Sequence, residues 1–82
     1  MDDSERKAKV CCNEGAELLK QKIYDVAIMK FDKALEMDPN LADAWHNKGL
    51  AYRESGNYEE ALKCFDKALE INPELYRTLI SK

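Results

Sequence analysis

The chain has 82 residues, of which 35% are charged and 45% hydrophobic, and its formal net charge is -3 at pH 7. This length has room for one domain, and the acidic balance argues against sequence-independent binding of nucleic acid, which needs a basic surface to displace counterions. No apolar run approaches the length of a membrane span and the acidic start is unlike a secretory signal, so we expect a cytoplasmic protein with neither membrane nor nucleic-acid partners.

Apolar and small residues recur at helical spacing in segments that are separated by turn or proline signals. The expected helices, in chain order, cover residues 4–21, 24–37, 41–54, 58–71 and 74–81. No segment shows the alternation of a strand, so the sequence predicts an all-α chain of about five helices.

The turns inside the two halves of the chain differ in their residues. In the second half, Gly56 can adopt the left-handed backbone that ends a helix, and the side chain of Asn57 is expected to cap the next one. Lys22 stands at the corresponding place in the first half. Because lysine lacks the freedom of glycine at positive φ, we expect that turn to be strained or differently shaped.

The chain repeats itself with a period of 34 residues. Phe31–Glu36 returns letter for letter as Phe65–Glu70, and thirteen positions are identical when residues 8–41 are aligned with residues 42–75. A period of this size is the mark of stacked helical units, each of which buries its apolar face against its neighbours.

Some of the repeated residues also indicate how the helices pack and which face is exposed to solvent. Glycine inside a helix costs about 1 kcal/mol relative to alanine, so its recurrence at Gly15 and Gly49 predicts close approach of two helices. The Asp-Lys pair of each repeated block, and Glu59 with Lys63 four residues later, are expected on a solvated outer face.

The repeated positions resemble those of the tetratricopeptide repeat, a helix-turn-helix unit of 34 residues. The matching residues are Trp45, Gly49, Tyr52, Tyr58, Ala61, Phe65, Ala68 and Pro73 in the second unit, and Gly15, Leu18, Tyr24, Ala27, Phe31, Ala34 and Pro39 in the first. The first unit departs from the pattern with Cys11 in the place of the tryptophan, where we expect a small buried side chain. Glu14 and Lys48 stand where leucine usually precedes the glycine.

The resemblance implies an α-solenoid, a right-handed stack of antiparallel helix pairs. Residues 8–41 and 42–75 would be two full repeats, residues 76–82 a partial third that acts as a capping helix, and residues 1–7 an extension of the first helix. Members of this family bind a peptide or a helix of a partner protein in a concave groove lined by the first helix of each pair. Neither catalysis nor a cofactor is expected.

When the groove positions of the family are transferred to this sequence one residue at a time, the residues found there include charged, polar and apolar side chains. They are Lys9, Cys12, Asn13, Ala16, Leu19 and Lys20 in the first unit, Asp43, His46, Asn47, Leu50, Arg53 and Glu54 in the second, and Arg77, Ile80 and Ser81 beyond them. The basic members could bind a carboxylate or an acidic peptide, and the leucines could receive an apolar side chain. The plainer interpretation is a solvated helix face.

Two sharper site hypotheses find little support. Family members that hold the terminal carboxylates of chaperones use a set of lysine, asparagine and arginine side chains; of the matching residues, only Asn47 is retained and Arg77 is a partial substitute. A metal site at Cys11, Cys12 and His46 lacks the remaining ligands that tetrahedral zinc requires. We expect no metal.

The second function class is a structural or assembly unit. About three repeats are usually needed for stability, so the chain could be a fragment of a longer array or could self-associate into a homo-oligomer through its apolar C-terminal helix. Three cysteines, an odd number without framework spacing, fit a reducing compartment.

Overall fold

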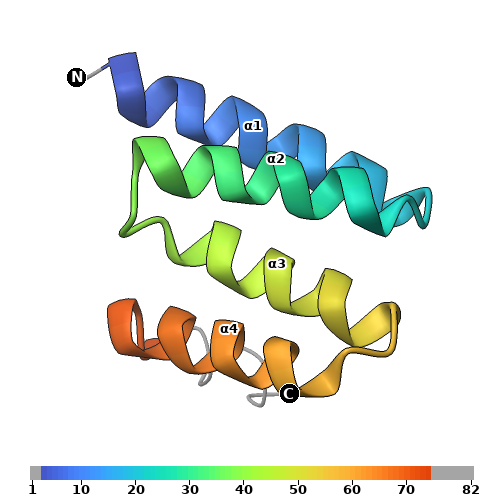
Figure 1. The fold of residues 1–82 in the computed structure, drawn as a ribbon. Coiled ribbons are helices and arrows are strands. Elements are labelled where there is room, and N and C mark those ends of the chain that lie inside the picture. Colours follow the sequence, from blue (N-terminus) through green and yellow to red (C-terminus); the bar gives the residue numbers. More distant parts are fainter. Residues whose placement is uncertain (1–2, 75–82) are drawn as a thin grey trace.

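The computed structural model describes residues 3–74, which fold as two helix pairs lying side by side (Figure 1). The helices are α1 (Asp3–Lys20), α2 (Tyr24–Met37), α3 (Ala42–Glu54) and α4 (Tyr58–Ile71). Their bounds lie within one residue of the sequence prediction, and no strand occurs among the described residues. The prediction of an all-α repeat stack is confirmed. Most of the expected fifth helix, together with the partial third repeat, lies outside the described residues.

The order of helix contacts defines an inner and an outer side of the stack. Each helix packs against the next one along the chain, and α1 also contacts α3. By contrast, α2 and α4 do not contact each other. The first helices of the two pairs therefore lie closer together than the second helices, on the inside of the curve.

The repeated glycines let a phenylalanine ring lie directly on the backbone of the neighbouring helix. A Cβ placed on Gly15 would stand 2.6 Å from Cε1 of Phe31, and one placed on Gly49 would stand 2.7 Å from Cε1 of Phe65. Real Cβ atoms do not approach so closely, so the predicted close approach of the helices is confirmed.

The core between the two pairs is built around Phe31, the largest fully buried side chain among the described residues. It belongs to a cluster that also contains Ala44 and Ala51 of α3, both with no exposed surface. The residues 34 positions earlier in α1 are Val10, which is 51% exposed, and Glu17, whose side chain is 67% exposed. Alanine occupies these positions in α3, which packs against the first helix pair, and not in α1.

Both turns within the pairs have the same hydrogen-bond pattern. Ile23 N–H donates to the Leu18 carbonyl and Lys22 N–H to the Leu19 carbonyl, and the second unit repeats both bonds at its equivalent residues. Lys22 has a φ of 65° and its counterpart Gly56 a φ of 96°. The turn at Lys22 was expected to be either strained or differently shaped. It has the same shape as the turn at Gly56, and a lysine at positive φ is strained.

The expected side-chain cap of α4 is absent. Asn57 precedes α4 and its backbone N–H donates to the Tyr52 carbonyl, but its side chain makes no capping bond. Glu59 and Lys63 are exposed, as expected for a solvated outer face, and Lys63 pairs with Glu60 at 3.4 Å.

Asp32 is the one residue of the repeated Asp-Lys pairs that departs from the expected solvated outer face. Its carboxylate instead lies 2.5 Å from Lys48 Nζ on α3, so it joins the two units. The same ammonium group lies 5.3 Å from the ring centre of Trp45 and 5.9 Å from that of Tyr52. Burial lowers the pKa of Lys48, but the hydrogen bond and charge of Asp32 outweigh this, so the pKa is raised on balance. Lys48 replaces the usual leucine with an inter-unit ion pair.

Candidate functional site

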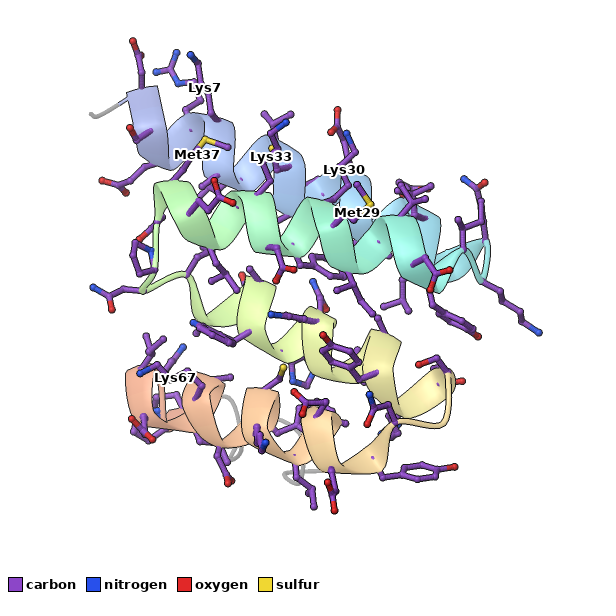
Figure 2. The ribbon with its side chains drawn as sticks, viewed as in Figure 1. Lys7, Met29, Lys30, Lys33, Met37 and Lys67 are labelled. Atoms are coloured by element: carbon purple, nitrogen blue, oxygen red, sulfur yellow. The ribbon has the colours of Figure 1, made fainter. Side chains whose placement is uncertain are left out.

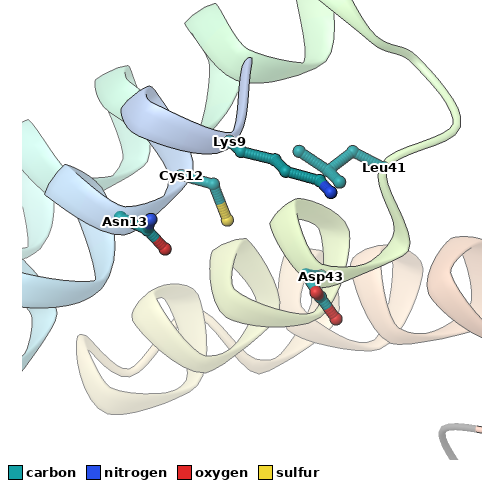
Figure 3. A pocket seen from close by; sticks show the side chains of 5 residues that line it. All are labelled: Lys9, Cys12, Asn13, Leu41 and Asp43. Atoms are coloured by element: carbon teal, nitrogen blue, oxygen red, sulfur yellow. The ribbon is translucent and has the colours of Figure 1, made fainter. Parts of the chain in front are cut away.

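The candidate groove follows the inner side of the stack, where α1 and α3 contact each other. Four of the predicted residues come together there. Lys9, Cys12 and Asn13 of α1 and Asp43 of α3, together with Leu41, line a pocket of about 250 Å³ (Figure 3). Both units contribute, so the pocket exists only because α3 packs against the first pair.

The pocket has an apolar floor and a polar rim. Leu41 is half-buried and Cys12 is 5% exposed, whereas Lys9, Asn13 and Asp43 are exposed. Figure 3 shows the Lys9 side chain extended towards Leu41, while the Asp43 side chain on α3 points away from Lys9. Neither Lys9 nor Asp43 makes an ion pair with another residue of the described range.

Cys12 is the residue whose surroundings the sequence predicted least well. The expectation placed the buried cysteine at Cys11, which is only half-buried; Cys12 is the buried one, because α1 turns it towards α3. Asn47 Nδ2 donates a hydrogen bond to Cys12 Sγ at 3.7 Å. Burial raises the pKa of the Cys12 thiol although this hydrogen bond opposes the rise. The group is therefore a neutral thiol at pH 7 and not a nucleophile.

His46 lies next to this contact on α3. Its ring centre is 5.5 Å from that of Phe65, in a tilted arrangement. Burial lowers the pKa of His46, with a nearby Arg53 adding to the effect and Asp43 opposing it. The imidazole is consequently neutral at pH 7 and presents a polar but uncharged edge to the groove.

The remaining predicted groove residues lie farther along α1 and α3. Ala16, Leu19 and Leu50 are half-buried, and Leu19 packs on the core cluster. Lys20 pairs with Glu17 at 3.7 Å and Arg53 with the adjacent Glu54 at 3.3 Å. Arg77, Ile80 and Ser81 lie outside the described residues.

Sequence reasoning missed Leu41 because it precedes α3 and is not on the helical face from which the other positions were read. The signal that could have indicated it is that leucine stands at this position in both units, as Leu41 and Leu75. Within residues 3–74, no group of three or more His, Cys, Asp or Glu side chains is placed to hold a metal ion. The three cysteines are free thiols. None of the helices in this range is long and apolar enough to cross a membrane.

The fold and the 34-residue period define a helical repeat protein with an inner face made by the first helix of each pair. Comparison with known families gives the particular class. Residues 42–75 match the family model of the tetratricopeptide repeat. Residues 42–75 therefore form a tetratricopeptide repeat, and the four helices of the chain are consistent with stacked repeats of this kind. Such repeats generally mediate protein-protein interactions.

A curated relative is the uncharacterized protein MJ0572 of Methanocaldococcus jannaschii, which is 39% identical over 56 residues. The aligned part is 68% of this chain and 65% of that protein. Because that protein is uncharacterized, the similarity adds no fold, partner or substrate.

Proposed function

We propose that this protein is an interaction module that binds a short segment of a partner protein along the inner faces of α1 and α3. The observation that carries the proposal is the pocket between the helix pairs. Its five lining residues come from both units, and four of them are residues that the family resemblance led us to expect in the groove. A single helix pair could not form it.

The size of the pocket favours a side chain of a bound peptide over a small-molecule ligand. Its volume of about 250 Å³ is below the roughly 300–1,000 Å³ of typical small-molecule sites. Leu41 and the neutral thiol of Cys12 offer apolar contact at its base. We therefore expect an apolar anchor residue in the bound segment.

The rim of the pocket adds selectivity by charge. Lys9 and Asp43 carry opposite signs, are exposed and have no ion-pair partner within residues 3–74. A segment with one acidic and one basic side chain beside its apolar anchor would satisfy both. A uniformly acidic or basic segment would meet one repulsive charge, which disfavours it.

The test is selection of peptides from a displayed random library, followed by fluorescence anisotropy with the best peptide in synthetic form. Lys9→Glu and Asp43→Lys should each weaken binding at least tenfold. The matched control is Lys33→Glu, an equally drastic charge reversal on the exposed side of α2 (Figure 2), which should leave Kd unchanged. Circular dichroism checks that each variant keeps its helices.

If the groove variants bound the peptide with the same affinity as the parent protein, the assignment of the groove as the binding site would be refuted. If Lys33→Glu weakened binding and the groove variants did not, the peptide would lie on the outer helices. Loss of affinity at higher salt in the parent, but less so in Lys9→Glu, would support the role given to the rim charges.

A further inference from the structure

The exposed side of α2 carries a row of apolar side chains. Ile23, which directly precedes the helix, is followed at intervals of three residues by Val26 and Met29, and the three are 40%, 39% and 66% exposed. Side chains three residues apart form one of the ridges with which helices pack against each other. Among the described helices, α2 contacts α1 and α3, and neither of them covers this apolar row.

The second unit provides an internal comparison, because its residues at these positions are polar. The counterparts of the apolar row are Asn57, Glu60 and Lys63. A buried position of the same helix is unchanged, since Ala27 of α2 recurs as Ala61 of α4 and both are buried. The repeat therefore folds without an apolar row. Contiguous exposed apolar side chains that the fold does not need, and that charged residues surround, are typical of an interaction site.

The charged residues around the apolar row are mostly basic. Lys22 precedes the row in the chain, and Lys30 and Lys33 follow it along α2, where they lie next to Met29 (Figure 2). Lys22 and Lys33 are exposed and make no ion pair within residues 3–74. Lys30 pairs with Glu14 at 3.3 Å, and its side chain stays 38% exposed. Two free ammonium groups therefore flank the row.

The comparison between the units extends to these charges. The counterparts of Lys22 and Lys30 are Gly56 and Cys64, neither of which is charged. The first unit therefore has two additional lysines together with its apolar row. Asp25 adds one carboxylate beside the row.

We propose that the exposed side of α2 is a second binding surface, which takes an amphipathic helix of a partner protein. The apolar ridge of that helix would pack on Ile23, Val26 and Met29. Its glutamate or aspartate side chains would bind the surrounding lysines through charge-assisted hydrogen bonds, which fix its register. This surface is separate from the groove between α1 and α3, and it does not depend on the proposed function.

A second copy of this chain fits the apolar row less well than an acidic helix does. If two rows packed antiparallel with Val26 at the centre, Lys22 of one copy would lie opposite Lys30 of the other. If they packed parallel, each lysine would lie opposite its own equivalent. Both arrangements bring like charges together, which is repulsive.

An anionic membrane also attracts lysine side chains, but the shape of the apolar row favours a protein helix. Helices that lie on a membrane bury a broad apolar face, whereas this row is a narrow ridge of the kind that packs on a single helix. Asp25 stands directly before Val26, and anionic lipid head groups would repel its carboxylate.

The test exchanges the apolar row for its counterpart in the second unit. The triple variant Ile23→Asn, Val26→Glu and Met29→Lys gives α2 the side chains with which α4 folds, so its circular dichroism and Tm should stay close to those of the parent. Met29→Lys alone changes only the most exposed of the three positions and leaves the core untouched.

The probe is a peptide selected from a displayed library of helix-forming sequences with random surface positions. The selection uses Lys9→Glu protein, so that peptides specific for the groove are not enriched. The best peptide is then synthesised with a fluorescent label. In fluorescence anisotropy, its affinity should fall by about tenfold or more in the triple variant and by roughly threefold in Met29→Lys. Equal affinity for the parent and the triple variant, or no recovered peptide, would overturn the proposal.

Charge reversals separate this surface from the groove. Lys33→Glu should weaken binding of the helical peptide, whereas Lys9→Glu should bind it as the parent does, which is the opposite of the pattern expected for the groove peptide. The selected peptides should be enriched in aspartate and glutamate, and added salt should weaken their binding. Peptides without this enrichment, or unaffected by Lys33→Glu, would contradict the role of the lysines and overturn the proposal while leaving the groove assignment intact.

Two measurements on the parent protein test the other occupants. Sedimentation velocity would show a dimer that the triple variant abolishes if a second copy covered the apolar row. Co-sedimentation with vesicles of phosphatidylcholine and phosphatidylserine would show binding that the triple variant loses if the row met a membrane. Either result would overturn the proposal, and a monomer that stays in solution supports it.

Discussion

The two equivalent glycines provide a controlled test of how firmly the core holds its aromatic rings. In Gly15→Ala the new Cβ would lie 2.6, 2.8 and 2.9 Å from Cε1, Cδ1 and Cζ of Phe31, and in Gly49→Ala it would lie 2.7, 2.8 and 3.1 Å from the same atoms of Phe65. The clash is almost identical. The rings differ in burial, since Phe31 has no exposed surface and Phe65 is half-buried.

The expected free energies follow from two opposing effects. Replacing a glycine inside a helix by alanine stabilises the fold by roughly 0.5–1 kcal/mol. Overpacking a filled core costs roughly 1–3 kcal/mol. Phe31 is enclosed between α1 and α3 and has nowhere to move, so Gly15→Ala should lose about 1–2 kcal/mol net. Phe65 can shift towards its exposed side, so Gly49→Ala should stay within about 0.5 kcal/mol of the parent.

Thermal and urea unfolding followed by circular dichroism measures both variants. A loss of 1 kcal/mol corresponds to roughly 4–8 °C in Tm for a domain of this size. The cause is checked with Phe31→Leu, which should cost less in the Gly15→Ala background than in the parent, because the smaller side chain makes room for the added methyl group. If Gly15→Ala raised Tm, or if both glycine variants changed it equally, the explanation from ring burial would be refuted.

Three further predictions concern single positions. Lys22→Gly should stabilise the fold by about 1 kcal/mol in urea unfolding, because it relieves a φ of 65°; Gly56→Ala should lose a similar amount, and a loss in Lys22→Gly would contradict the strain. Ala51→Glu should cost about 3 kcal/mol or more, because it places a carboxylate where no surface is exposed; Glu17→Ala, the reverse change at the equivalent exposed site, should stay within about 0.5 kcal/mol. The folded-state pKa of His46 is lowered, so the unfolded chain binds more protons just below pH 6.5 and stability should fall as pH drops through that value; His46→Gln should flatten this part of the Tm profile, and an unchanged profile would exclude His46 as its source.

The helices and the close contacts within each pair could be predicted from the sequence because they depend on local patterns. The apolar spacing gave the bounds of α1 to α4 to within one residue. The recurrence of Gly15 and Gly49 predicted a close approach of two helices, which the structure shows as the contact of each glycine with a phenylalanine ring. Such contacts join neighbouring helices of one hairpin, whose geometry follows from a short turn.

The candidate site was predicted less completely. Lys9, Asn13 and Asp43 were expected in one groove, and the structure places them around one pocket. Leu41 was missed, and the burial of Cys12 was not anticipated. Both depend on how closely α3 approaches α1, and no pattern within either helix encodes that distance.

By itself, the sequence determined the 34-residue unit, its two helices and the residues that hold them together, since equal residues at equal offsets must make equal local contacts. Only the tertiary structure decided what those residues do between units. It turned Asp32 from the outer face towards Lys48 and left Glu17 exposed where Ala51 is buried. The physical reason is that a repeat copies local chemistry, whereas burial and pairing depend on which neighbour lies behind each helix.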